Sequence, residues 1–385
     1  MAVKVIVKKE ALEGAIKKVA GVYSQMGKKD SALIVMQAVN GKRGDQVFKG
    51  LTLTISNGST QVSTNLFCEM ESEIEGNVSF SVGADLINAV NALSGAKGEK
   101  YTLTESESVV VVSMGNNNIK IPKKAEGVMP VPFDITLPET KIEGKICITG
   151  KDFRTGVASI LFAALADDDK ALGGIGCIVD GAKMVFRATD SVRLAEATIS
   201  TVKVDAEGAV DFVVSPSVIK LITATAGDGN VAIIKTTKHL LVQVGNDMWQ
   251  IALLDKNYPH KVFDCLNTAG GIVNINKAEL LVALDIISAT DNIMESTARL
   301  SIEEDESGNA TMVIYSRDEQ SRATVAIKKE GDVPLVTCYA TKLLKSCSMA
   351  FKGETLNFVL AEKAPGIITA DGEGIRAALC PVKNK

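Results

Sequence analysis

VKVIVKKEALEGAIKKVA, residues 3–20, passes from an alternating apolar run into a helical pattern without interruption. Beyond Val7, apolar side chains recur at steps of four and three residues, which places them on one face of a helix. The same arrangement occurs in KICITGKDFRTGVASILFAA (145–164) and GIVNINKAELLVALDIISA (271–289). The apolar positions of the three helices are Leu12, Ile16 and Val19, then Phe153, Val157 and Ile160, then Leu280, Leu284 and Ile287. The chain therefore contains one strand-and-helix unit three times.

A second strand-and-helix pattern follows each of these units, in FSVGADLINAVNALSG from Phe80, FVVSPSVIKLITATAG from Phe212 and VTCYATKLLKSCSMAFKG from Val336. An isoleucine in a short strand-like run lies 39 residues after each of these starting points, at Ile119, Ile251 and Ile375. Between the two helices, alternating runs such as LTLTIS, MVFRAT and TMVIYS predict half-buried strands. Each unit is therefore predicted to be two helices packed on antiparallel sheets, in the α+β class.

Three domains of similar size follow from these repeats. A third of the 385 residues is about 128, which is a common domain size. The boundaries are expected in the Pro-rich stretch EGVMPVPFDITLPETK (126–141) and in KNYPHKVFDCLNTAG (256–270). We therefore expect domains at 1–126, 141–256 and 271–385. Such short linkers favour a rigid curved array of domains.

The composition is that of an ordinary folded protein: 46% of the residues are hydrophobic and 23% are charged, which excludes wholesale disorder. No run approaches the roughly 20 apolar residues of a membrane span, and no long apolar region follows a basic N-terminus, so a cytoplasmic protein is expected. The seven cysteines show no CxxC spacing, and neither histidine completes a zinc set. We therefore expect free thiols, with no metal and no cofactor.

Charge is distributed unevenly along the chain. The net charge of −4 argues against a protein that coats nucleic acid non-specifically, because such affinity comes from many Lys and Arg contacts with phosphates. The six expected helices nevertheless carry a net +5 together, which leaves −9 for the rest of the chain. A helix-lined surface that faces phosphates explains this excess. Lysine is also a good helix former, and this alternative explains the excess equally well.

ATDSVRLA, residues 188–195, places an acid and an arginine side by side. Asp190 and Arg193 suggest a catalytic pair, but Ser191 has no histidine nearby in the sequence to act as its base. LGGIGC (172–177) matches no phosphate-binding loop and is predicted to be a tight turn into a strand. The acidic run ADDD (166–169) is interpreted as a solvated loop rather than a cation site. We expect no catalytic residues and interpret ATDSVRLA as a structural or binding turn.

Several motifs, taken in their order along the chain, resemble those of one protein family. The three copies of a two-helix unit, ATDSVRLA in the middle third, NYPHKV at the second boundary and the C-terminal AALCPVKNK together resemble the bacterial replicative sliding clamp, the beta subunit of DNA polymerase III. In that family the middle motif is typically ATDGHRLA, the boundary carries a Phe-Pro or Tyr-Pro pair, and the chain ends in a strand similar to MPMRL. The resemblance covers the whole chain. It implies a DNA clamp fold, in which a head-to-tail homodimer forms a six-domain ring and twelve helices line a hole for duplex DNA.

The resemblance also implies a function in DNA replication: a non-catalytic processivity factor that encircles duplex DNA without reading its sequence and tethers the DNA polymerase. The other implied partners are the clamp loader and further proteins with a clamp-binding motif; no membrane is involved. Two alternatives stay open. One is a clamp-like paralogue with a structural or regulatory role, and the other is a nucleic-acid enzyme, which requires convergent acids or a nucleophile with its base.

In the family, ATDxxRLA forms part of a pocket between the middle and last domains that captures short peptide motifs of partner proteins. The resemblance implies that this pocket is formed here by Leu172, Thr189, Ser191, Val192, Arg193, Leu194, Pro259, Val262, Phe263, Cys380, Pro381, Val382 and Lys383. Ser-Val replaces the usual Gly-His at 191–192, Cys and Val replace methionines at 380 and 382, and lysine replaces arginine at 383. We therefore expect a reshaped, smaller and stiffer pocket. Arg193 also has a purely structural interpretation, as the partner of Asp190.

The remaining site residues concern DNA and the subunit contact. Lys28 stands where the family has an arginine, whereas Lys170 and Ala171 stand at the family's aromatic pair. From motif position and helix charge, the expected DNA-binding residues are Lys17, Lys18, Lys28, Lys29, Arg154, Lys220, Lys342 and Lys345. Positions near the family's subunit contact predict a dimer interface that includes Ile119, Ile286 and Ile287.

Overall fold

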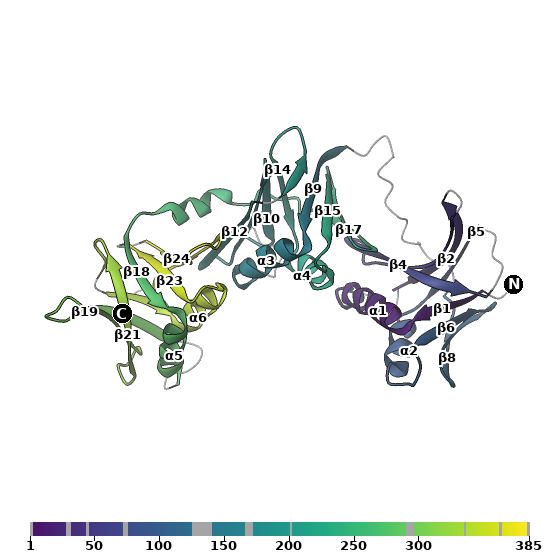
Figure 1. Ribbon diagram of the computed structural model, residues 1–385, viewed down its shortest axis with the longest axis horizontal. Helices are drawn as coiled ribbons and strands as arrows, with labels where there is room; N and C mark the ends of the chain where they lie inside the picture. Colours follow the sequence, from purple (N-terminus) through teal and green to yellow (C-terminus); the bar gives the residue numbers. More distant parts are fainter. Residues whose placement is uncertain are drawn as a thin grey trace. The chain divides into compact units, whose positions relative to one another are not determined.

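One order of elements occurs three times along the chain (Figure 1). Each run has a strand, a helix, a group of strands, a second helix and three further strands. The computed structural model of the protein describes residues 3–27, 32–43, 46–71, 76–124, 141–165, 172–200, 202–289, 296–334, 336–361 and 364–382. The expected repeat is thus visible in the order of the elements.

The first run begins with a strand that leads directly into a helix, β1 (Lys4–Lys8) and α1 (Lys9–Ser24). Its remaining elements are β2 (Ile34–Arg43), β3 (Gln46–Ser56), β4 (Thr60–Met70), β5 (Gly76–Val82), α2 (Asp85–Leu93), β6 (Lys100–Glu105), β7 (Val109–Met114) and β8 (Asn117–Pro122). The alternating run LTLTIS lies in β3, as predicted, and Ile119 lies in β8.

The second run begins with β9 (Ile142–Thr149) and α3 (Gly150–Ile160), and a short 3-10 helix, η2 (Leu161–Ala163), extends α3. It continues with β10 (Ile175–Asp180), β11 (Lys183–Thr189), β12 (Arg193–Ile199), β13 (Lys203–Asp205), β14 (Val210–Val214), α4 (Pro216–Thr225), β15 (Asn230–Thr236), β16 (His239–Val244) and β17 (Asp247–Ala252). LGGIGC is confirmed as a turn that leads into β10.

The third run follows the 3-10 helix η3 (His260–Asn267) and begins with β18 (Gly271–Asn276) and α5 (Lys277–Ser288). The Asn276 side chain caps α5, because its Oδ1 accepts a hydrogen bond from the Glu279 amide at 3.1 Å. The other elements are β19 (Thr297–Glu304), β20 (Ala310–Tyr315), β21 (Arg322–Glu330), β22 (Val336–Ala340), α6 (Thr341–Met349), β23 (Thr355–Leu360), β24 (Gly366–Thr369) and β25 (Ile375–Leu379).

The helices bury the faces that the periodicity predicts. The nine apolar positions of the three strand-and-helix units, in α1, α3 and α5, are at most 2% exposed. Burial of a side chain of this size contributes roughly 1.5–3 kcal/mol. The faces therefore attach each helix to its sheet: α1 packs on β3 and β4, and α5 packs on β18, β20 and β21.

Contacts between residues divide the chain into two compact units. The first comprises Met1–Lys151, Asp205–Glu207 and Leu221–Leu253, and the second comprises Asp152–Val204, Gly208–Lys220 and Leu254–Lys385. This division does not follow the expected boundaries at 1–126, 141–256 and 271–385, which stay a prediction. Within the described ranges, no helix is long and apolar enough to cross a membrane.

The first unit is built on a branched antiparallel sheet. Its strands run in the order β9, β15, β16, β17, β4, β1, β6, β7 and β8, and a side branch from β4 continues through β3 and β2 to β5. Helices α1 and α2 pack against each other (Figure 1). Residues of the second and first runs thus share one sheet through the pairing of β17 with β4.

The second unit is built on one long antiparallel sheet. The strand order is β14, β10, β11, β12, β25, β24, β23, β18, β21, β20, β19 and β22. Helices α5 and α6 pack side by side against this unit's sheet, and η3 packs against β25. This topology places the turn between β11 and β12 beside the end of β25, although about 190 residues separate them in the sequence. Most of the predicted peptide-binding residues meet there.

Candidate binding site

ATDSVRLA forms the turn of a hairpin between β11 and β12. The carboxylate of Asp190 closes the turn, because its Oδ1 accepts hydrogen bonds from the amides of Val192 (3.0 Å) and Arg193 (2.7 Å). The Thr189 hydroxyl donates to the Arg193 carbonyl oxygen at 2.8 Å and accepts from the Ser191 amide at 3.2 Å. Asp and Thr side chains favour turns through local bonds of this kind. The sequence prediction of a turn is therefore confirmed.

Ser191 has an unusual backbone conformation, with φ of 78°. A side chain in this left-handed region costs roughly 1–2 kcal/mol, whereas glycine adopts it freely. The hydrogen bonds of Asp190 and Thr189 hold the residue in this conformation. The local geometry therefore explains why glycine is the typical residue at this position of the motif.

Arg193 is held on both sides of its guanidinium group. Nε and Nη2 lie 2.8 and 2.7 Å from Asp190 Oδ2, and Nη1 donates to the Ser346 hydroxyl at 2.7 Å. The guanidinium carbon also lies 5.7 Å from the centre of the Phe162 ring. The pairing of Arg193 with Asp190, which the structural interpretation of this arginine expects, is thus present. It neutralises both charges, so Arg193 shapes the surface and presents little net charge to a ligand.

The C-terminal segment runs beside this turn. Arg193 pairs with Leu379, the last residue of β25, and the Cys380 amide donates to the Val192 carbonyl oxygen at 2.9 Å. The Val382 amide donates to the Cys338 carbonyl oxygen at 2.8 Å. Val192 and Val382 are each 41% exposed, and Cys380 and Pro381 are also exposed. Two distant segments therefore place apolar side chains on one stretch of surface.

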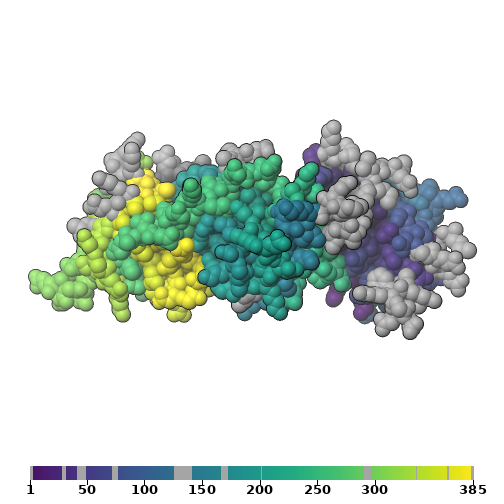
Figure 2. Space-filling view, turned by 90° about the horizontal axis from the view of Figure 1, so that it is seen from above, coloured from purple at the N-terminus to yellow at the C-terminus, as the bar shows by residue number. Residues whose placement is uncertain are grey.

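Helix η3 supplies a third segment. Pro259 precedes its first residue, Val262 is 42% exposed, and Phe263 is buried in a cluster against which Leu194 packs. Figure 2 shows η3 on the surface as part of the green segment beside the yellow C-terminal strands. We name Val192, Val262 and Val382 the valine surface. Its members are exposed side chains on the β11–β12 turn, on η3 and on the C-terminal segment, three segments that adjoin β25.

The thiols close to this surface are uncharged at neutral pH. Burial raises the pKa of Cys380, and the Asp190 carboxylate raises it further. Burial also raises the pKa of Cys265, on η3. A neutral thiol behaves as a small apolar group with weak hydrogen bonding. These two thiols therefore add no charge to the surroundings of the three valines.

The remaining predicted pocket residues do not belong to the valine surface. Thr189 is 1% exposed, and its hydroxyl group forms hydrogen bonds within the β11–β12 turn. Leu172 is half-buried and lies in the turn before β10. Lys383 lies outside the described residues, as do the acidic run 166–169 and positions 170 and 171. Sequence reasoning missed Phe162 and Ser346, which contact Arg193. No local pattern marks them, because both are distant from ATDSVRLA in the sequence.

The predicted DNA-binding residues differ in their surroundings. The side chains of Lys17, Lys220 and Lys342 are exposed, and Arg154 is half-buried. Lys18 Nζ instead lies 2.6 Å from Oδ2 of Asp247, whose side chain is 4% exposed. Lys345 forms an ion pair with Asp285. Lys28 and Lys29 lie outside the described residues.

The three predicted interface isoleucines also differ. Ile286 in α5 is 46% exposed, and Ile119 in β8 is half-buried. Ile287 is fully buried in the core of its own unit, on the apolar face of α5. Its side chain is therefore a core residue, and we retain only Ile119 and Ile286 for a proposed subunit contact.

Comparisons with known proteins agree with this architecture. The family model described as DNA polymerase III beta subunit, central domain, matches residues 147–260. Comparison of the sequence with curated proteins gives no significant match. At the level of structure, the chain is similar to a sliding clamp from Pseudomonas aeruginosa bound to griselimycin, with 17% identity, full coverage of both chains and a TM-score of 0.84.

Two further structures give the same result. A sliding clamp from Bacillus subtilis is 17% identical, with full coverage of both chains and a TM-score of 0.81. A DNA polymerase III beta subunit from Thermotoga maritima is 18% identical, with 99% of both chains covered and a TM-score of 0.80. Identity this low establishes the fold rather than the details of any site. The predicted α+β DNA clamp fold is confirmed.

Replacing Ser191 by glycine is expected to stabilise the protein. The change relieves the cost of a side chain at positive φ, about 1–2 kcal/mol, and about 0.5–1 kcal/mol of this is lost to the greater freedom of glycine in the unfolded chain. We expect a net gain of about 0.5–1 kcal/mol, measured by thermal unfolding of the full chain. Ser307→Gly is the control, because Ser307 also lies in an Asp-capped turn but has no positive φ. An equal effect in both variants contradicts the interpretation.

Proposed function

Because this chain belongs to the sliding-clamp family of DNA polymerase III beta subunits, by its central-domain match and its fold, we propose that it acts as a sliding clamp in DNA replication. In this proposal it is a non-catalytic processivity factor that encircles duplex DNA and holds a DNA polymerase on its template. The observation that carries the proposal is the threefold order of elements, which agrees with clamp structures over the whole chain.

The proposed assembly is a head-to-tail homodimer with cytoplasmic location. Three similar domains per chain, with boundaries at 1–126, 141–256 and 271–385, give six domains and a closed ring, as cyclic symmetry requires. Ile286 supports a subunit contact, because a large apolar side chain that is 46% exposed gains stability when it is buried. Ile119, on the edge strand β8, is the second proposed contact residue.

Contact with DNA is proposed to be weak and independent of sequence. Exposed lysines in three helices, Lys17 in α1, Lys220 in α4 and Lys342 in α6, provide a modest positive charge. A small number of phosphate contacts permits sliding. Each further contact would release counterions from the DNA and so strengthen binding to one place on it. The ring itself, rather than these contacts, keeps the protein on DNA.

Partner proteins are proposed to bind at the valine surface. An extended peptide from a polymerase or a clamp loader, with one or two large aliphatic side chains, buries them against Val192, Val262 and Val382. Micromolar affinity corresponds to about −8 kcal/mol, which a few buried anchors supply after the ordering cost of the peptide. The neutral Arg193–Asp190 pair supports a ligand whose main contribution is apolar.

The function is tested by retention on DNA. Wild-type protein loaded by a clamp loader with ATP is expected to stay on circular duplex DNA and to leave linear duplex DNA through its ends. Ile286→Glu should give monomers in light scattering and no retained protein, because a buried unpaired charge opposes the subunit contact. Met248→Glu is the control, since Met248 is 39% exposed and lies in β17. Equal retention of wild type on circular and linear DNA overturns the proposal.

Adjacent lysines test the DNA contact. Lys17→Ala should reduce the salt dependence of direct DNA binding by about one unit in the log–log slope, as expected for the loss of one phosphate contact. Lys18→Ala should change the slope little, because Asp247 already neutralises Lys18. The slope is measured by fluorescence anisotropy of a labelled duplex. If Lys17→Ala and Lys18→Ala change the slope equally, the ion pair between Lys18 and Asp247 does not decide which of the two lysines contacts DNA.

Charge placed on the valine surface tests the peptide site. Val382→Asp and Val192→Asp should each weaken the binding of a peptide from the organism's own polymerase by about tenfold or more, because a bound apolar anchor then desolvates a carboxylate. Calorimetry measures the affinity. The control is Val282→Asp, since Val282 is 60% exposed but lies in α5. Unchanged affinity in both surface variants, with rings still formed, removes the site assignment.

A further inference from the structure

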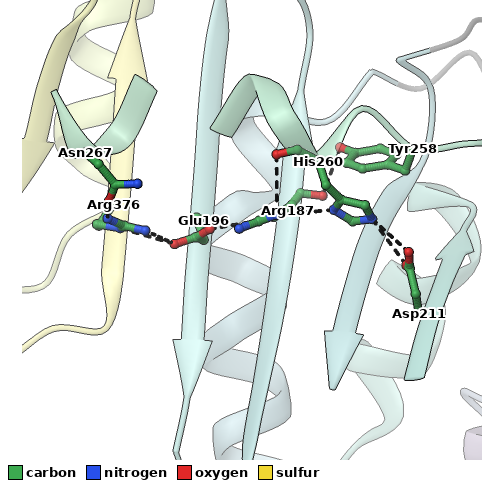
Figure 3. Close-up of polar contacts among 7 residues, drawn as sticks. All are labelled: Arg187, Glu196, Asp211, Tyr258, His260, Asn267 and Arg376. Carbon is green, nitrogen blue, oxygen red and sulfur yellow. Dashed lines mark hydrogen bonds and ion pairs between the residues drawn. The ribbon is translucent and has the colours of Figure 1, made fainter. Parts of the chain in front are cut away.

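Three charged side chains form a row across the sheet of the second unit. Arg187 on β11 lies opposite Glu196 on β12, and Glu196 lies opposite Arg376 on β25. The Arg187 Nε donates to Glu196 Oε2 at 2.8 Å, and the Arg376 Nε donates to Glu196 Oε1 at 3.1 Å. The Glu196 side chain is only 4% exposed. One buried carboxylate therefore holds two arginines, one on each oxygen (Figure 3).

The two arginines reach opposite ends of η3. The Nη1 of Arg187 lies 3.3 Å from Nδ1 and 3.5 Å from the carbonyl oxygen of His260, the first residue of η3. The Nη1 of Arg376 donates to Oδ1 of Asn267, the last residue of η3, at 2.9 Å. Figure 3 shows Asn267, Arg376, Glu196, Arg187 and His260 in this order. Glu196 thus connects both ends of η3 to the sheet.

The geometry determines the tautomer of His260. A guanidinium group only donates hydrogen bonds, so Nδ1 of His260 must accept from Arg187. The ring proton is therefore on Nε2, which lies 3.2 Å from Oδ1 of Asp211 and donates to it. In addition, the guanidinium carbon of Arg187 lies 5.1 Å from the centre of the Phe263 ring, within η3. Arg187 thus contacts η3 at its start and in its middle.

The energetics of a buried row of charges favour a role in positioning η3 over a role in stabilising the fold. The cost of removing charges from water offsets most of the attraction within a buried ionic group, and apolar residues of similar size are often equally stable there. Charged hydrogen bonds have strict geometry, however, and planar guanidinium groups bond in fixed directions. The row therefore fixes where η3 lies more than it adds to the free energy of unfolding.

We propose that Glu196, Arg187 and Arg376 are positioning residues that fix η3 on the sheet and so set the place of Val262 in the valine surface. The second half of this statement rests on the proposed peptide-binding function. The first half does not, because it concerns only the attachment of η3 to β11, β12 and β25.

Hydrogen exchange of the full chain tests the attachment. Arg187→Met and Arg376→Met keep an apolar stem of similar length, and each leaves Glu196 with one arginine. We expect exchange of the η3 amides to rise about tenfold, equivalent to about 1.4 kcal/mol. The rise should centre on the Val262 amide in Arg187→Met and on the Thr268 amide in Arg376→Met, since both amides bond within this segment.

The matched control is Arg322→Met. Arg322 also lies on a strand of the second unit, but its bond to Glu303 is 3.8 Å long and both side chains are more than half exposed. Exchange in η3 should equal that of wild type in this variant. Unchanged η3 exchange in both Arg187→Met and Arg376→Met overturns the proposal. A rise that is equal in η3 and in β18–β21 also overturns it, because it reports general destabilisation.

The imidazole nitrogens provide a second measurement. The chain has only two histidines, so a nitrogen-15 spectrum resolves His260 from His239, and His239→Gln assigns the signals. Wild type should show His260 with its proton on Nε2. Arg187→Met should shift the Nδ1 signal, because Nδ1 loses its hydrogen bond from the guanidinium group while Asp211 still accepts from Nε2, whereas Arg376→Met should leave the wild-type signal. A mixture in wild type contradicts the hydrogen bond from Arg187.

Peptide affinity separates the two halves of the proposal. Both arginine variants are expected to bind the polymerase peptide about tenfold more weakly than wild type and Arg322→Met. If hydrogen exchange of the η3 amides becomes faster while the peptide affinity is unchanged, the proposed effect of the row on the valine surface is overturned. If wild type binds no peptide, the proposed peptide site fails together with that link, while the exchange and nitrogen-15 results still decide whether the row fixes η3.

Discussion

The candidate site depends on the antiparallel pairing of β12 with β25, which joins the middle of the chain to its end. Arg193 lies opposite Leu379, and one further bond connects the Cys380 amide to Val192. A register shift of one residue would move every side chain of β25 to the other face of the sheet. The shift would separate Arg376 from Glu196 and move the C-terminal valine away from the turn. The apolar surface and the ionic row below η3 therefore depend on the same register.

Charges around the site are neutralised close to where they occur. Asp190 pairs with Arg193, and the Glu196 carboxylate holds two arginines. In the first unit, Asp247 pairs with Lys18 in the same way. Attraction between close charges is stronger away from water, so these groups interact with each other rather than with a distant ligand. The three valines stay exposed beside these paired groups.

The Ser191–Val192 sequence at the turn costs some conformational energy and adds apolar surface. Ser191 occupies a conformation that favours glycine, and the bonds of Asp190 to two backbone amides offset this cost. Val192 follows with its side chain 41% exposed, and it adds apolar area where the C-terminal segment ends. The departure from the usual motif thus retains the turn and changes the chemistry of the surface that the turn presents.

Local periodicity by itself determined the strands, the helices, their buried faces and the threefold repeat, because these features depend on residues a few positions apart. The same periodicity places Ile287 on the core face, although it was also expected at a subunit contact, and Ile286 is the exposed neighbour. Only the tertiary structure decided that Lys18 pairs with Asp247 while Lys17 stays exposed. It alone brought Arg187, Glu196 and Arg376 into one row. Such partners come from distant strands, and strand pairing depends on packing and register that no local pattern encodes.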